Sequence, residues 1–124
     1  MTTTRGWVIG LLRLAILLVA LGSDRLYAED PAAGAKVSKA HCAKCHGDEG
    51  RGDGSGLQKL QVDVKPAPWP DKAAMAKWKD EDLRRIITAG GKAVGKSKVM
   101  PAYRDKLSET ELADVIAYIR SLAK

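Results

Sequence analysis

The sequence predicts an all-α fold in one small domain. Apolar side chains recur at helical spacing in residues 80–89 and 108–122, and no segment alternates apolar and polar residues as a strand does. The 124 residues are room for one domain. Leu, Ile and Val make up only about 17% of residues 29–124 and Phe is absent, so side chains alone leave the core short of bulk. We therefore expect a cofactor to complete it.

Residues 1–28 are typical of a secretory signal peptide rather than of a folded element. Two arginines precede the apolar run 14–21, and a short polar stretch then leads to Ala28. Cleavage after Ala28 would leave a mature domain of residues 29–124 in the periplasm. The alternative is an uncleaved membrane anchor, but the apolar run is shorter than the roughly 20 residues that span a bilayer.

The first helix of the domain is predicted from Pro31 to about His46. Asp30 can cap its first turn, and a proline at the first helical position loses no hydrogen bond. Gly47 ends the helix and opens a loop, residues 47–56, in which every second or third residue is glycine.

Residues 58–69 are expected to be an extended, irregular connection, because Pro66 and Pro68 interrupt regular structure. A short turn of helix is expected around Met75. The next helix is predicted over residues 80–89, which carry three acidic side chains in their first turn and are followed by two glycines.

The last helix is the best specified. Ser108 and Glu111 form a capping box, and Leu107 and Leu112 are placed to act as a hydrophobic staple. Apolar residues then follow at helical spacing on one face, namely Leu112, Val115, Ile116, Ile119 and Leu122.

The chemistry is carried by Cys42-Ala43-Lys44-Cys45-His46. On a helix the two thiols and the imidazole project from one face, since they stand at positions i, i+3 and i+4. Two thiols so placed can add to the two vinyl groups of one haem, and the imidazole can reach its iron. This spacing is the signature of covalent c-type haem attachment.

Other uses of the two cysteines are weaker. A structural zinc site needs four ligands, and the only other histidine, His41, is expected to point away round the helix. A thioredoxin-like redox pair needs a βαβ context, which is absent. A disulfide between Cys42 and Cys45 would close a tiny loop and add little stability.

The second axial ligand of the iron is predicted to be Met100. It precedes Pro101 in a non-periodic stretch, and a loop held by proline can present a thioether to a metal. Met75 is the alternative, although its simplest role is that of a core side chain. His41 is a third option. Its neighbour Cys42 holds the helix against the haem, however, and this directs the His41 side chain away from the iron. A pair of histidine and methionine ligands raises the potential of the iron.

The motif, Met100-Pro101 and the ending at residues 113–122 together resemble the class I c-type cytochromes of the small bacterial periplasmic kind. The resemblance covers nearly all of residues 31–124. It implies three to five helices wrapped around one haem c, with crossing N- and C-terminal helices. It also implies thioether bonds at Cys42 and Cys45 and iron ligation by His46 and Met100.

Two further expectations come from that resemblance. Gly34 would let Tyr118 pack closely where the terminal helices cross. The carbonyl of Pro66 is the candidate acceptor for the proximal imidazole, which needs a partner to set its tautomer.

Trp69 and Trp78 are expected to wall the haem pocket.

The expected function is one-electron transfer, not enzymatic catalysis. The alternatives are a haem subunit fixed in a larger respiratory complex and a ligand-binding or peroxide-reacting haem with a labile sixth site. Acidic redox proteins or membrane respiratory complexes are the expected partners, which Lys44, Lys92, Lys96 and Lys98 would attract unless these lysines serve only solubility. A net charge of +4 on residues 29–124 is too small to indicate nucleic-acid binding. The protein is expected to be a monomer. Membrane contact would require an uncleaved N-terminal segment.

Overall fold

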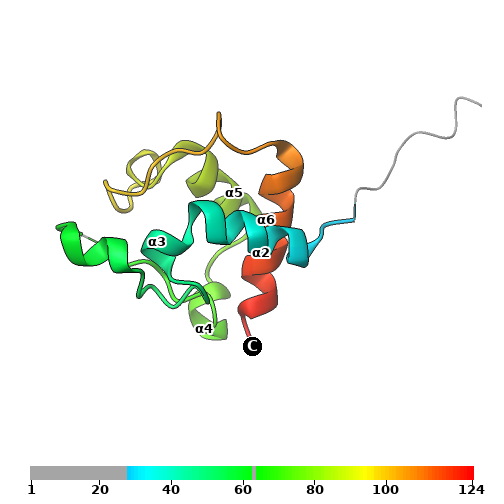
Figure 1. The fold of residues 1–124 in the computed structure, drawn as a ribbon, viewed down its shortest axis with the longest axis horizontal. Coiled ribbons are helices and arrows are strands. Elements are labelled where there is room, and N and C mark those ends of the chain that lie inside the picture. The colour runs from blue at the N-terminus through cyan, green and yellow to red at the C-terminus, as the bar shows by residue number, and fades with distance from the viewer. Residues whose placement is uncertain (1–27, 63) are drawn as a thin grey trace, which may run out of the picture.

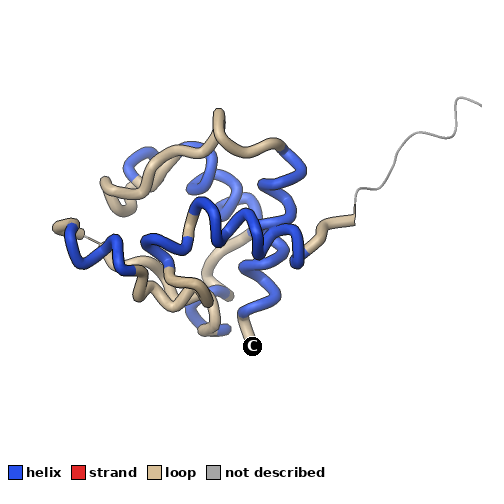
Figure 2. The backbone as a smooth tube through the Cα atoms, in the orientation of Figure 1, coloured by secondary structure: helices blue, strands red, loops and turns tan. Residues whose placement is uncertain are grey.

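The computed structural model describes residues 28–62 and 64–124, so the predicted signal peptide, apart from its last residue, Ala28, lies outside the described residues (Figure 1). Within the described part every regular element is a helix and none is a strand, which confirms the all-α prediction (Figure 2). The α-helices are α2 (Pro31–His41), α3 (Ala43–His46), α4 (Lys72–Met75), α5 (Asp80–Ala89) and α6 (Glu109–Leu122), and η1 (Ser55–Lys59) and η2 (Lys92–Val94) are 3-10 turns. No helix in these ranges is long and apolar enough to cross a membrane.

The first helix begins as predicted but is interrupted at Cys42. The side chain of Asp30 accepts a hydrogen bond from the Ala32 amide and caps α2. In a continuous helix the carbonyl of His41 would accept from the Cys45 amide. Instead it accepts from the Tyr103 hydroxyl at 2.8 Å, and Cys45 donates to the carbonyl of Cys42. The prediction of one unbroken helix to His46 is therefore wrong, because a distant side chain competes for a backbone acceptor.

The predicted crossing of the terminal helices is present. α2 packs against α6 more extensively than any other pair of elements, and Figure 1 shows the two helices crossing. At the crossing, Gly34 lies against the backbone of Asp114 and the Cβ of Tyr118. The amide of Asp30 also donates to the Asp114 carboxylate at 2.8 Å. Gly34 thus permits the close approach that was expected of it.

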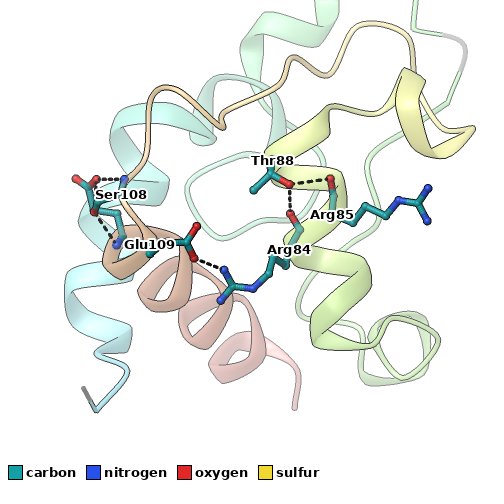
Figure 3. Close-up of polar contacts among 6 residues, drawn as sticks. Arg84, Arg85, Thr88, Ser108 and Glu109 are labelled. Atoms are coloured by element: carbon teal, nitrogen blue, oxygen red, sulfur yellow. Dashed lines mark hydrogen bonds and ion pairs between the residues drawn. The ribbon is translucent and has the colours of Figure 1, made fainter. Parts of the chain in front are cut away.

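α6 begins at the capping box that its sequence predicts. The Ser108 hydroxyl accepts from the Glu111 amide, and the Glu111 carboxylate accepts from the Ser108 amide at 2.9 Å. Arg84 on α5 forms an ion pair with Glu109 at 2.6 Å, which joins the two helices on the surface (Figure 3). The bounds of α5 also agree with the prediction.

The turn η1 was not predicted. Residues 47–56 form a loop as expected, but the chain tightens at its end, where the Leu57 amide donates to the carbonyl of Gly54. Gly54 and Gly56 lie directly on the backbone of Lys44, so the loop packs on α3 where a side chain would not fit. The absence of Cβ atoms allows this contact to be made.

The core lies between α2, α5 and α6 and extends to the irregular segments. Its buried apolar residues are Val37, Trp69, Met75, Leu83, Ile87, Leu112, Val115, Ile116 and Ile119. Two of them come from outside the long helices, namely Trp69 from the proline-rich connection and Met75 from α4. This core is small for a domain of this size, as the composition predicts.

Candidate functional site

A cavity of about 310 Å³ adjoins the core, and its walls are mainly apolar. Its lining comes from five separate parts of the chain: the end of α2 with α3, the connection 57–69, the segment from α4 to α5, the loop 96–103, and α6, which contributes Val115 and Ile119. This volume lies at the lower end of the range for small-molecule and cofactor sites. A small core beside an apolar cavity is the arrangement expected of a domain completed by a cofactor.

The two cysteines both line this cavity, and both thiols are free. No disulfide joins Cys42 to Cys45. Burial raises the pKa of the Cys42 thiol to about 11, so the thiol is protonated at neutral pH. The structure therefore places two reduced thiols three residues apart at the edge of an apolar cavity.

The imidazole of His46 lies against the same cavity and is largely buried. Burial lowers its pKa to about 4, because an apolar setting disfavours the charged ring. The ring is therefore neutral at pH 7 and has a lone pair available, the form in which histidine binds metals. Its plane is stacked on the indole of Trp69, with centroids 4.6 Å apart and planes inclined by 21°.

The expected hydrogen bond from His46 to Pro66 is not formed. The Nδ1 atom of His46 is buried and has no hydrogen-bond partner within residues 28–62 and 64–124. Pro66 does line the cavity, but its carbonyl lies against Gly52 instead. The contact that orients the ring in the structure is the one with Trp69, which was predicted only to wall the pocket.

The three candidates for the second ligand are placed differently. Met75 also lines the cavity, but it is 1% exposed and packs in the core, as its simplest role predicts. Met100 is partly exposed, lines the cavity and stands on a loop. His41 also borders the cavity, contrary to the expectation that it points away, and its ring lies edge-on to Tyr103 with centroids 6.1 Å apart.

The loop that carries Met100 is anchored on both sides. The Gly91 amide donates to the carbonyl of Met100 at 3.1 Å, and the Tyr103 amide donates to the carbonyl of Ile87 at 2.9 Å. The Tyr103 hydroxyl reaches the end of α2, as described above. These bonds fix the backbone at Met100 and three residues after it, so the residue is kept beside the cavity that it lines.

Sequence reasoning missed Arg120. This α6 residue donates to the carbonyls of Met75 and Trp78 and pairs with Asp80 at 2.7 Å, so it secures the turn that forms one wall of the cavity. No local sequence signal identifies such a role. Arg51, in the glycine-rich loop, pairs with Glu49 at 2.8 Å on the surface.

The residues around the cavity fit a haem better than a bare metal ion. Among the residues that the structure describes, no three His, Cys, Asp or Glu side chains are grouped so that they could hold a metal ion. Zinc is therefore disfavoured. Two free thiols, a neutral buried imidazole and two methionine thioethers, those of Met75 and Met100, border the apolar cavity, and these are the groups that haem c requires for attachment, ligation and burial.

Comparison with known proteins gives a consistent result. The model of the family described as cytochrome c oxidase, cbb3-type, subunit III matches residues 29–119. Cytochrome c6 of Nostoc sp. is 31% identical over 109 residues, which cover 88% of this chain and 85% of the relative. Cytochrome c6 of Picosynechococcus sp. is 31% identical over 98 residues, which cover 79% and 78% of the two chains.

Solved structures agree with the sequence comparisons. A c-type cytochrome named KustC0563 matches with a TM-score of 0.56 at 26% identity, over 73% of this chain and 98% of that chain. Cytochrome c6 from the diatom Phaeodactylum tricornutum matches with a TM-score of 0.52 at 25% identity, over 74% and 92% of the two chains. The fold and the sequence therefore lead to the same group of proteins.

Proposed function

The chain belongs to the class I c-type cytochromes, and we propose that it is a one-electron carrier with His46 and Met100 as its axial ligands. As a member of this family it carries one haem c, attached through Cys42 and Cys45. The observation that carries the proposal is the apolar cavity bordered by both thiols, a neutral imidazole and one partly exposed thioether. When bound, the haem supplies the redox chemistry. With His46 and Met100 both bound to its iron, no position would stay open for a substrate, so the chain acts as an electron carrier rather than an enzyme.

The protein's own residues would keep the site unchanged while an electron moves. His46 is held by its stack on Trp69, and Met100 by the bonds on either side of its loop. Because both ligands are fixed before any change of charge, little has to rearrange between the two oxidation states. The apolar walls exclude water and, with the ligand pair, raise the reduction potential.

Acidic redox proteins are the proposed partners. Lys96 and Met100 both line the cavity, and the Lys96 ammonium lies 5.5 Å from the centre of the Trp78 ring. Lys92 and Lys98 flank the same loop in sequence. Positive charge at this position would steer a negatively charged partner toward the cofactor, an effect that salt weakens. We propose the periplasm as the location, reached through the signal peptide of residues 1–28.

A fixed subunit of a respiratory complex is the second candidate. It is favoured by the match to the family described as subunit III of a cbb3-type oxidase. The two roles share their chemistry and differ at the N-terminus, because a permanent subunit would keep a tether. A mass that corresponds to a chain beginning at Glu29 supports the free carrier, whereas a chain that retains residues 1–28 supports the fixed subunit.

The optical spectrum of the exported holoprotein tests the electron-carrier proposal. A reduced spectrum typical of haem c, together with the weak charge-transfer band of methionine-bound ferric iron, is expected for the wild type. Met100→Ala should abolish that band, and Met75→Leu should keep it, because Met75 is a core residue. A high-spin ferric spectrum that shifts when cyanide is added would instead support the ligand-binding alternative and refute the carrier.

A further inference from the structure

The ring of His46 makes one close aromatic contact, and that contact is with Trp69. The two rings are nearly parallel, inclined by 21° with centroids 4.6 Å apart, which is a stacked geometry. Trp69 is 6% exposed, so its indole is held by the core and has little freedom to turn. The plane of the imidazole is therefore set against a rigid surface.

A histidine that binds a metal usually has its other ring nitrogen fixed by a hydrogen bond. Among the residues that the structure describes, no group accepts from Nδ1 of His46, although that atom is buried. The carbonyl of Pro66, the expected acceptor, faces Gly52. Something other than a hydrogen bond must therefore define the rotation of the ring, and the flat face of Trp69 is in contact with it.

The indole of Trp69 packs directly on the backbone of Gly50, which we call its seat. The Trp69 amide donates to the carbonyl of Gly50 at 2.9 Å, so the two backbones are joined. A Cβ on Gly50 would lie 2.5 Å from Cδ2 of the indole, which is a severe overlap. The same glycine has φ of +69°, a conformation that side chains rarely adopt. Gly50 thus allows the indole to lie flat, at the depth where it meets His46.

We propose that Trp69 is a positioning residue that fixes the plane of the His46 imidazole by stacking, with Gly50 as the seat of its indole. The inference rests on the proposed ligation of iron by His46. Rotation of an axial imidazole about the iron–nitrogen bond changes how unpaired spin is distributed over a ferric haem. Trp69 would therefore determine the electronic structure of the oxidised state as well as the packing of the pocket.

The test is proton NMR of the ferric holoprotein, in which the order and spread of the four haem-methyl signals report the orientation of the axial ligands. Trp69→Leu removes the flat face and should change this pattern or split it into several. Trp69→Phe keeps an aromatic face and should restore one pattern close to that of the wild type. A role in stability alone would lower the melting temperature of both variants without reordering the signals.

A second pair of variants tests the same contact in case Trp69→Leu does not fold. Gly50→Ala should displace the indole and reorder the signals as Trp69→Leu does. Gly95→Ala is the matched control, because Gly95 has the same φ of +69° but no atom within 4 Å of a Cβ placed there. It introduces the same backbone strain without touching Trp69, and its pattern should equal that of the wild type.

The outcomes separate this proposal from the proposed function. A wild-type spectrum without a bound histidine would overturn both. A normal wild-type spectrum with unchanged haem-methyl signals in Trp69→Leu, or equal patterns in Gly50→Ala and Gly95→Ala, would overturn only the role of Trp69. Reordered signals in Trp69→Leu and Gly50→Ala, with recovery in Trp69→Phe, would establish it.

Discussion

Gly34 on α2 lies in direct contact with the backbone of Asp114 on α6. A Cβ on Gly34 would be 2.5 Å from the carbonyl carbon of Asp114 and 2.9 Å from the Cβ of Tyr118. Neither group is the mobile end of a side chain, so neither can move aside at low cost. The crossing of the terminal helices therefore depends on the absence of a single carbon atom.

Gly34→Ala is expected to destabilise the fold by at least about 1–3 kcal/mol, the usual cost of overpacking. Replacing glycine with alanine inside a helix ordinarily raises stability by about 1 kcal/mol, so the expected effect has the opposite sign. Chemical denaturation of the holoprotein measures the effect. Lys36→Ala, an exposed change on the same helix, should be nearly neutral. Equal or greater stability of Gly34→Ala would show that the two helices can separate freely.

Arg120 and Arg84 carry the same charge but should differ in their contribution to stability. Arg120 donates to two backbone carbonyls, those of Met75 and Trp78, in a partly buried place. Arg84 forms one exposed ion pair with Glu109. Arg120→Leu should cost about 1.5–3 kcal/mol because it leaves those carbonyls without a charged donor. Arg84→Leu should cost about 0–1 kcal/mol. Thermal unfolding of both variants measures the difference, and equal losses would contradict the assignment.

Tyr103 is expected to stabilise the loop that carries Met100. Its hydroxyl donates to the carbonyl of His41 at 2.8 Å, and Tyr103→Phe removes that bond at a cost of about 0.5–1.5 kcal/mol. The charge-transfer band of bound methionine should then be lost at a lower temperature than in the wild type. Tyr118→Phe removes a bond of the same kind, to the Asp48 carbonyl at 3.2 Å, and should leave that temperature closer to the wild type. If Tyr118→Phe lost the band at a lower temperature than Tyr103→Phe, the Tyr103 bond would not be what stabilises the Met100 loop.

The capping box of α6 should make stability depend on pH in the acid range. Hydrogen bonds from the backbone and then the side chain of Ser108 lower the pKa of Glu111 below its ordinary value. The unfolded chain therefore binds a proton at Glu111 more tightly than the folded chain does. The ionised Glu111 carboxylate thus stabilises the fold, and this stabilisation is complete above the ordinary pKa of glutamate. It is lost as pH falls through the lowered pKa of the folded state. Glu111→Gln should flatten the dependence of unfolding free energy on pH in that window.

Ser108→Ala tests the cap itself. Loss of the hydroxyl that accepts from the Glu111 amide should cost about 1 kcal/mol at neutral pH, because a donor of the first helical turn loses its partner. Thr110→Ala, an exposed change in the same turn, serves as the control and should cost less. Urea denaturation of the two variants at pH 7 measures the difference. No difference between them would mean that water replaces the cap.

Features that depend on neighbours in sequence were predictable, and features that depend on distant contacts were not. The helix starts at Asp30 and Ser108 follow from caps within three residues. Cys42 and Cys45 line one cavity, as their spacing predicts, although the helix breaks at Cys42. The break after His41 depends on Tyr103, 62 positions away. The stack of Trp69 on His46 likewise joins residues that only the folded chain brings together. A sequence pattern identifies the ligand types, whereas their orientation depends on the tertiary structure.

His46 and Met100 are proposed to bind the same iron. Proton NMR of the reduced holoprotein tests this ligation, because the methyl group of an iron-bound methionine is shifted far upfield by the haem ring current. We predict one such signal, absent in Met100→Ala and retained in Met75→Leu. A signal that persists in Met100→Ala would contradict the account, as would a wild-type protein that lacks the signal and binds carbon monoxide.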